Sequence, residues 1–188
     1  MVQDLRMLNR GTLLAELLRS RPTSRKQLAL ATGISPATVT RVVAGLKAEG
    51  VLREIEEVVV DARGRREMLL DLVTERELVV GVDLGASNTR VLLADLAGNP
   101  FSVHAQPTQK ELDAKSLGLW AAQAVLDAAG GAFERASRIV LVVPGAVSRP
   151  TQHITNAPNL PQLEEPVFLD AVSGKLGKPV VLENDANA

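Results

Sequence analysis

Three segments in the second half of the 188-residue chain carry side chains suited to a phosphorylated or hydroxylated ligand. The first begins with Asp83-Leu84-Gly85 and ends at Thr89, directly after the apolar run 78–82. Small residues let backbone N–H groups approach a phosphate, and an Asp at a strand end can hold a hydrated magnesium ion. A glycine-containing β-hairpin turn has the same sequence, so both interpretations stay open here.

The other two segments carry carboxamides and a carboxylate. Residues 156–161 read Asn-Ala-Pro-Asn-Leu-Pro, and amides, which both donate and accept, suit the neutral hydroxyls of a sugar; an ordinary Asn/Pro turn is the alternative. Residues 183–187 read Glu-Asn-Asp-Ala-Asn after an apolar strand. In a kinase, Asp185 in this place takes a proton from a sugar hydroxyl. A helix N-cap formed by Asn184 or Asp185 is the alternative.

A different chemistry is indicated near the N-terminus, where Arg63, Arg65 and Arg66 surround Gly64. Strand-like residues flank this cluster: 51–60 is rich in β-branched residues, and apolar residues alternate over 68–72. The pattern predicts a hairpin whose basic tip meets phosphates or a minor groove. A solvated surface cluster is the alternative.

Three helices are expected before this hairpin. The first, residues 4–19, carries an apolar stripe formed by Leu5, Leu8, Leu14, Leu17 and Leu18. Ser24 caps a second helix over 25–32, which Gly33 ends. Ser35 caps a third helix with Pro36 at its first position, and its buried face consists of Val39, Val42, Val43 and Leu46.

A helix, a short glycine turn and a second helix form the layout that places a helix in the major groove of DNA. Together with the basic hairpin, this layout predicts a winged helix-turn-helix. The apolar stripes alone are also found in any three-helix bundle, which is the alternative. The residues expected near DNA are Arg25, Ser35, Thr38, Thr40 and Arg41, with Arg63, Arg65 and Arg66 in the wing.

After residue 74 the pattern predicts strands near 78–82, 90–96, 101–105, 138–143 and 179–182, and helices near 111–129 and 168–176. The resulting order is β-β-β-α-β-α-β, which indicates a mixed sheet with helices on its faces.

The net charge of the chain also changes sign after residue 74. Residues 1–74 hold twelve Lys/Arg against nine Asp/Glu, a net charge of +3, and residues 75–188 hold nine against thirteen, a net charge of -4.

The composition excludes several classes of protein. Apolar residues make up 46% of the chain, so a core can be buried, and the absence of cysteine excludes disulfides, thiolate zinc sites and thiol catalysis. His104 and His153 have no partner at metal-ligand spacing, so we expect no metal and no cofactor. No apolar run approaches the roughly 18 residues of a membrane helix. With no signal peptide at the start, we expect a cytoplasmic protein without membrane contacts.

The order and combination of these segments resemble the N-terminal half of a ROK-family (repressor, open reading frame, kinase) transcriptional regulator. The resemblance covers nearly all of the chain and also includes Pro144-Gly145-Ala146-Val147. It implies an α/β fold in which a winged helix-turn-helix over 1–74 binds double-stranded operator DNA, commonly as a homodimer. A partial actin-like (ribonuclease H-like) mixed β-sheet lobe over 75–188 would sense a sugar or sugar phosphate.

Site residues follow from the resemblance by motif. Asn159, Asn184 and Asp185 would line the sugar site, and Asp185 matches the catalytic base of the kinase members. The residues that match the first phosphate loop of the kinases are Asp83, Gly85 and Thr89.

The family pattern also contains a second Gly-rich phosphate loop, a Gly-His segment and a Cys-rich zinc motif, none of which occurs in this sequence. The resemblance therefore implies an incomplete lobe without kinase activity or zinc, with Asp185 as a vestigial base. We also expect apolar strand residues such as Leu141 and Val180 to lie bare on one face of the sheet.

The hypothesis from the sequence is a DNA-binding regulator, a repressor, of carbohydrate-utilisation genes. A ROK-type, glucokinase-like sugar kinase fragment with an N-terminal extension is the alternative, and a pure interaction module is a third. Kinase members need no helix-turn-helix segment, so the first 70-odd residues argue against the second hypothesis.

Overall fold

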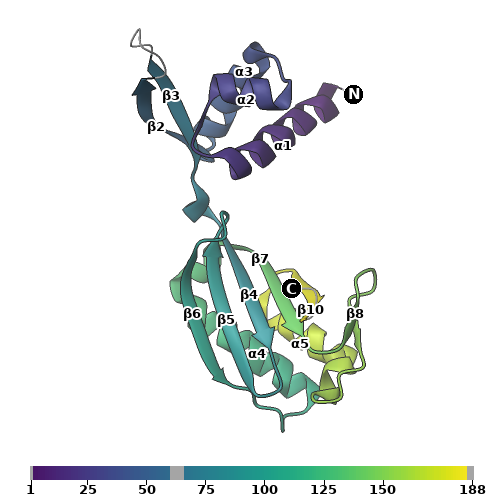
Figure 1. Ribbon diagram of the computed structural model, residues 1–188. Helices are drawn as coiled ribbons and strands as arrows, with labels where there is room; N and C mark the ends of the chain where they lie inside the picture. The colour runs from purple at the N-terminus through teal and green to yellow at the C-terminus, as the bar shows by residue number, and fades with distance from the viewer. Residues whose placement is uncertain (1, 60–65, 186–188) are drawn as a thin grey trace. The chain divides into compact units, whose positions relative to one another are not determined.

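The computed structural model describes residues 2–59 and 66–185, and the chain divides into two compact units, Met1–Thr74 and Glu75–Ala188 (Figure 1). Each unit has its own hydrophobic core. The first unit contains α1 (Val2–Ser20), β1 (Thr23–Ser24), α2 (Arg25–Thr32), α3 (Pro36–Ala48), β2 (Leu52–Val59) and β3 (Arg66–Leu72). Its strands form one antiparallel sheet in the order β1-β3-β2.

The core of the first unit lies between the helices and one face of this sheet. On the sheet, Leu52 pairs with Leu72 and Glu54 with Leu70. Because directly paired residues and residues two apart share a face, these four side chains point toward the helices. The buried residues of this core are Leu13, Leu17, Leu28, Val39, Val43, Leu46, Leu52, Leu70 and Leu72.

The stripe predicted for α1 is largely wrong. Leu5, Leu8 and Leu18 are exposed. Of the predicted residues, Leu17 is buried and Leu14 packs against the core, and the prediction omitted Leu13, which is also buried. The spacing of four residues between Leu13 and Leu17 places both on the side that meets the other helices. A regular apolar pattern does not reveal which of the leucines of α1 reach the hydrophobic core.

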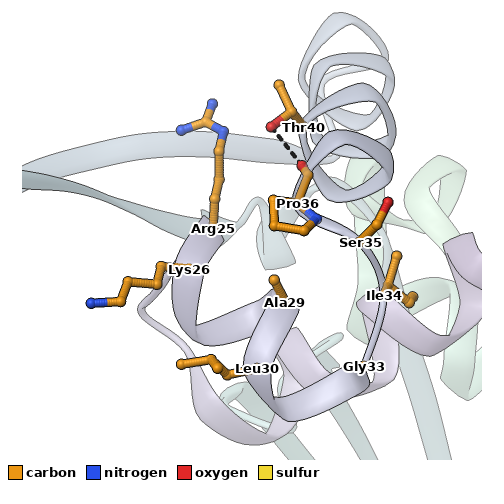
Figure 2. A pocket seen from close by; sticks show the side chains of 9 residues that line it. All are labelled: Arg25, Lys26, Ala29, Leu30, Gly33, Ile34, Ser35, Pro36 and Thr40. Carbon is orange, nitrogen blue, oxygen red and sulfur yellow. Dashed lines mark hydrogen bonds between the residues drawn. The ribbon is translucent and has the colours of Figure 1, made fainter.

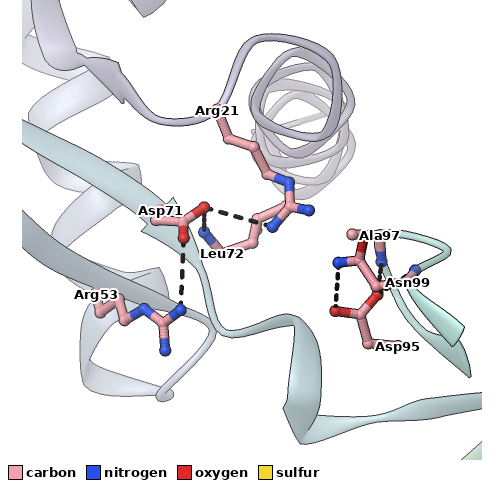
Figure 3. Close-up of polar contacts among 7 residues, drawn as sticks. All are labelled: Arg21, Arg53, Asp71, Leu72, Asp95, Ala97 and Asn99. Atoms are coloured by element: carbon pink, nitrogen blue, oxygen red, sulfur yellow. Dashed lines mark hydrogen bonds and ion pairs between the residues drawn. The ribbon is translucent and has the colours of Figure 1, made fainter. Parts of the chain in front are cut away.

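Asp71 on β3 links three segments of the first unit (Figure 3). Its Oδ1 lies 3.5 Å from Nη1 of Arg21, which follows α1, and its Oδ2 lies 3.5 Å from Nη2 of Arg53 on β2. Asp71 Oδ1 also accepts a hydrogen bond of 2.9 Å from the backbone N–H of Leu72. These contacts tie the end of α1 and strand β2 to β3, although such partly exposed pairs add little stability one by one.

The second unit is built on a mixed sheet of five strands in the order β10-β7-β4-β5-β6. Strands β4, β5 and β6 form an antiparallel meander, and β7 and β10 run parallel to β4. Its elements are η1 (Thr74–Arg76, which begins at the last residue of the first unit), β4 (Leu78–Leu84), β5 (Asn88–Asp95), β6 (Pro100–Pro107), α4 (Ala114–Ala129), η2 (Gly130–Arg135), β7 (Ala136–Val143), β8 (Ala146–Ser148), β9 (His153–Thr155), η3 (Pro161–Glu164), α5 (Pro166–Leu176) and β10 (Val180–Asn184).

Helices α4 and α5 pack against each other and cover one face of this sheet (Figure 1). Gly118 of α4 permits the contact, because a Cβ there would lie 2.5 Å from the backbone carbonyl oxygen of Phe168 on α5.

Asp95 closes the β5–β6 turn by accepting hydrogen bonds from the backbone N–H groups of Ala97 and Asn99 at 2.8 and 2.9 Å (Figure 3).

The expectation of a bare Leu141 is wrong. Leu141 lies in the core beneath the helices and is 1% exposed, because β7 is a central strand, while Val180 at the edge is partly buried. On the opposite face, Leu92 of β5 pairs with Val103 of β6, and both side chains are exposed.

Among the described residues, no single helix is long and apolar enough to cross a membrane. Within that part of the chain, only α2 and α3 taken together, which are bent by 120° relative to each other, reach that length and hydropathy.

Candidate nucleic-acid interface and ligand-binding loops

Side-chain caps hold α2 and α3 in place. The Ser24 hydroxyl accepts a hydrogen bond of 3.3 Å from the backbone N–H of Gln27, and the Gln27 side chain accepts one of 3.0 Å from the Ser24 N–H. This reciprocal capping box starts α2. Gly33 ends the helix with a φ of 69°, a left-handed conformation that glycine adopts without strain. After this tight turn, α3 runs at an angle of 120° to α2.

Ser35, expected near DNA, caps α3. Its hydroxyl accepts a hydrogen bond of 3.3 Å from the backbone N–H of Thr38 and donates one of 3.0 Å to the Thr38 hydroxyl. The Thr40 hydroxyl donates to the carbonyl oxygen of Pro36 at 2.9 Å (Figure 2). Ser35 and Thr40 are exposed, and Thr38 is partly buried. All three hydroxyls therefore support the start of α3 while their oxygens stay within reach of a ligand.

A hollow of about 490 Å³ lies between α2 and α3 (Figure 2). Arg25, Lys26 and Leu30 line it from α2, and Ser35 and the residues beside it line it from the turn and α3. Leu30 is 76% exposed, although Leu28 of the same helix lies in the core. The hollow thus combines two cations, hydroxyls and an exposed apolar side chain on one surface of the first unit.

The cationic side chains of α2 and α3 differ in their surroundings. Arg41 is exposed, and no ion pair of its guanidinium occurs within the described residues. Arg25, by contrast, donates from Nη2 to Oε1 of Glu54 at 2.7 Å, and Nζ of Lys47 lies 2.5 Å from the other oxygen of Glu54. Hydrogen bonds from Lys47 and then from Arg25 hold the pKa of Glu54 below its ordinary value. The sequence pattern alone indicated neither a contact for Lys47 nor a role for Glu54.

The predicted basic hairpin tip is only partly covered by the structure. Arg63 and Arg65 lie outside the described residues, and of Arg66 only the backbone is described, where it pairs with Val59 at the start of β3.

The phosphate-loop-like segment is a tighter turn than expected. Asp83 lies within β4 and Thr89 within β5, so the turn itself consists only of residues 85–87. Asp83 is directly paired with Arg90 across the two strands, and Nη1 of Arg90 donates to Oδ2 of Asp83 at 3.1 Å. Both side chains are exposed, so water and salt weaken this pair and leave the Asp83 carboxylate accessible.

Thr89 points inward and is 1% exposed. Its hydroxyl lies 2.9 Å from that of Thr108, which in turn donates to the carbonyl oxygen of Gly85 at 2.6 Å. The backbone N–H of Thr108 also donates to the carbonyl oxygen of Ser87 at 3.0 Å. Thr89 therefore supports the turn from its buried side, through the hydroxyl of Thr108. Its own hydroxyl does not face solvent.

Of the residues expected in a sugar site, Asn184 is the last residue of β10, Asp185 follows it, and Asn159 lies in the loop after β9. The Asn184 side chain donates to the carbonyl oxygen of Gly145, and the backbone N–H of Asp185 donates to the carbonyl oxygen of Val143 at 3.1 Å. Gly145 has a φ of 103°, and a Cβ there would lie 2.7 Å from the carbonyl oxygen of Thr155. The ends of β7, β9 and β10 thus meet at Gly145.

Asn159 follows β9 in a loop that is held from within. The backbone N–H of Ala157 donates to Oε1 of Glu164 at 2.8 Å, and Ala157 and Leu160 are buried. Asn159 itself is exposed, so its amide is free to face a ligand.

No group of three or more His, Asp or Glu side chains that could hold a metal occurs within 2–59 and 66–185. His104 and His153 are exposed.

A short β8–β9 hairpin and a lysine contact were missed by the sequence analysis. Lys178 Nζ donates to the carbonyl oxygens of Phe133, Glu134 and Ala136 at 2.9, 3.1 and 2.7 Å. This contact ties Lys178 to the end of η2 and the first residue of β7.

A crystal structure of a ROK-family transcriptional regulator, a homologue of the Escherichia coli MLC protein, has the same fold. It superposes on 96% of this chain and 46% of its own with a TM-score of 0.69 and 18% identity. The mixed α/β sheet of the second unit is thus of the kind found in the actin-like ROK proteins. The ROK family profile matches residues 79–188, more than half of the sequence, and the chain belongs to the ROK family.

Two curated relatives differ in how much of the chain they match. A glucokinase of Streptomyces coelicolor is 35% identical over 117 residues, which is 59% of this chain and 33% of the glucokinase. A transcriptional regulator of Mycobacterium bovis is 29% identical over 168 residues, which is 89% of this chain and 38% of the regulator. The chain therefore spans about a third of the length of these relatives.

Proposed function

We propose that the chain is a DNA-binding transcriptional regulator, a repressor of carbohydrate-utilisation genes. In this proposal the first unit is a winged helix-turn-helix and the second belongs to an actin-like, sugar-sensing lobe. The observation that carries the proposal is the extent of the matches. The Mycobacterium regulator aligns with 89% of the chain and the crystallised regulator with 96%, whereas the Streptomyces glucokinase aligns with 59%.

The geometry of the first unit supports DNA binding. Two helices joined by a short turn and crossing at 120° have the arrangement of a helix-turn-helix, in which the second helix enters the major groove. Thr40 and Arg41 lie exposed on that helix, and Arg25 lies at the start of the first. The net charge of +3 over residues 1–74 favours a polyanionic partner. We place Arg63, Arg65 and Arg66 in the wing.

Repression would follow from occupancy of an operator by a homodimer in the cytoplasm. A sugar or sugar phosphate bound by Asn159, Asn184 and Asp185 would shift the population of DNA-competent dimers, provided that it binds one state more tightly than the other. Support for a sugar comes from the glucokinase likeness of the second unit.

We further propose that this chain does not transfer phosphate. The Thr89 hydroxyl is turned into the protein, and Asp83 is paired with Arg90, so two of the three residues that match the kinase phosphate loop have protein partners. A ROK-type, glucokinase-like sugar kinase is the second candidate, because the glucokinase is 35% identical to this chain over 117 residues.

Selection of bound duplexes from a random DNA library tests the proposal. We expect the purified 188-residue chain to enrich one sequence family, and Arg41→Gln or Thr40→Ala to change which sequences are enriched. No salt-dependent binding to any duplex would refute the DNA-binding function. An assay with ATP and glucose is the second arm, and phosphorylation of the sugar by the purified chain would support the kinase instead.

A further inference from the structure

Glu54 is an acidic residue on the inward face of the sheet of the first unit. Leu52, two residues before it, and Leu70, directly opposite, are buried on the same face. The Glu54 side chain lies at the margin of that core and is 29% exposed. A carboxylate placed where the pattern favours an apolar residue needs charged partners, because partial burial disfavours its ionised form.

Those partners are two cations from the two helices of the proposed helix-turn-helix. Arg25, the first residue of α2, binds Oε1 at 2.7 Å, and Lys47, in the last turn of α3, binds Oε2 at 2.5 Å. Each oxygen of the carboxylate therefore holds one cation. The irregularity in the pairing of β2 with β3 begins directly after Glu54, where the ladder shifts before Glu57.

Both cations remain within reach of solvent and hence of a DNA backbone. The side chains of Arg25 and Lys47 are 33% and 35% exposed. A phosphate offers them the same charge-assisted hydrogen bonds that the carboxylate offers, so the two anions compete for the same donors. The triad of Arg25, Lys47 and Glu54 has a net charge of +1 with the carboxylate present and +2 without it.

We propose that Glu54 withholds Arg25 and Lys47 from the DNA backbone, so that binding requires a phosphate to replace the carboxylate as their partner. The inference rests on the proposed DNA-binding function and adds an autoinhibitory contact to it. Because the phosphate contribution is independent of sequence, such a contact lowers the affinity for every duplex, non-specific DNA included.

An orienting role for Glu54 is the competing explanation, and the geometry disfavours it. A carboxylate that fixes an arginine for recognition of a base does so best through two parallel hydrogen bonds from the guanidinium. Here Arg25 contacts Glu54 through Nη2 alone, and Lys47 occupies the second oxygen. Orientation and withholding predict opposite effects of removing the carboxylate, so one experiment separates them.

The test compares Glu54→Gln with Glu16→Gln in the full 188-residue chain. Glu16 is a partly buried residue of α1 that pairs with Arg19 at 2.9 Å, so its replacement changes the net charge equally without freeing Arg25 or Lys47. The probe is a fluorescently labelled duplex of arbitrary sequence, and anisotropy is measured over a series of KCl concentrations. We expect Glu54→Gln to bind more tightly at low salt and to steepen the slope of log K against log[KCl] by about 0.9 per released cation.

A double-mutant cycle adds a readout that a purely structural role would not move. Lys47→Gln is expected to change the salt slope little in the wild-type background, because Glu54 already holds that cation. In the Glu54→Gln background the same substitution is expected to reduce the slope by about 0.9. Circular dichroism confirms that each variant is folded.

Three outcomes contradict the proposal. Equal salt slopes for Glu54→Gln and Glu16→Gln, with normal binding by the wild type, refute the withholding role alone. Weaker DNA binding by a folded Glu54→Gln variant shows that the carboxylate orients Arg25 and refutes it as well. Absence of salt-dependent binding in every variant refutes the proposed DNA-binding function and this inference together.

Discussion

The hydroxyl oxygens of Thr89 and Thr108 lie 2.9 Å apart in the interior of the second unit. A threonine hydroxyl has one proton, and that of Thr108 goes to the carbonyl oxygen of Gly85 at 2.6 Å, so Thr89 is the donor in the bond between the two threonines. This chain of two hydrogen bonds connects β5 and the residue after β6 to the turn over residues 85–87.

Replacement of Thr108 by valine tests the importance of this chain. The substitution keeps the shape of the side chain but leaves the Gly85 carbonyl and the Thr89 hydroxyl without a buried partner. We expect the free energy of unfolding of the second unit to fall by about 1–3 kcal/mol. Urea unfolding followed by circular dichroism measures it. Thr155→Val, at an exposed position of β9, is the matched control and is expected to change stability by less than about 0.5 kcal/mol.

Gly118→Ala is expected to destabilise the contact between α4 and α5. The added Cβ would lie 2.5 Å from the carbonyl oxygen of Phe168 and 3.0 Å from Cβ of Ala171, so the helices must move apart. We expect a decrease in stability of about 1–3 kcal/mol, typical of overpacking. Gly174→Ala on α5 is the control, because its Cβ meets nothing within 4 Å. That substitution should stabilise the helix by about 0.5–1 kcal/mol, and an equal decrease in both variants would contradict the packing argument.

Ser35 is expected to have two separable roles. Ser35→Ala removes the cap of α3 and should lower the stability of the first unit by about 1 kcal/mol. Ser35→Asp keeps an oxygen that can accept from the Thr38 N–H but places a negative charge at the start of α3, which we expect to lie near DNA. The Asp variant should therefore stay near wild-type stability in urea unfolding and lose DNA affinity in anisotropy measurements. Unchanged affinity in Ser35→Asp would place the start of α3 away from the DNA backbone.

The lowered pKa of Glu54 predicts an acid-sensitive contribution to stability. The folded state binds fewer protons than the unfolded state at this group, so its contribution is present above the ordinary pKa of 4.5 and is lost as the pH falls through the lower pKa of the folded state. The difference in stability between the wild type and Glu54→Gln should therefore decrease as the pH falls below 4.5. Urea unfolding at a series of pH values measures this difference, and a constant difference would contradict the ion-pair geometry.

The proposed wing makes a prediction about salt dependence. Replacing Arg65 and Arg66 by glutamine together should weaken binding to all sequences and reduce the salt slope by about 0.9 for each phosphate that the variant no longer neutralises. Replacing Thr40 or Arg41 should alter sequence preference more than salt dependence. If the double arginine variant binds as tightly as the wild type, the wing assignment is wrong.

Local structure was determined largely by the sequence itself. Ser24, Gly33, Ser35 and Pro36 set the bounds of α2 and α3, because caps and turns depend on residues within four positions of one another. Apolar runs located the five strands of the second sheet for the same reason. The predicted turn at Asp83–Thr89 was too long, since hairpin pairing draws both end residues into strands.

Contacts between distant residues were decided only by the tertiary structure. Glu54 meets Arg25 across 29 positions, and Thr89 meets Thr108 across 19, through strand register and helix packing that no local pattern contains. Packing also decided that Leu17 of α1 is buried while Leu5 is exposed. Residue types thus indicated which groups can bind DNA or sugar, and the packed chain decided which of those groups are already engaged by another side chain.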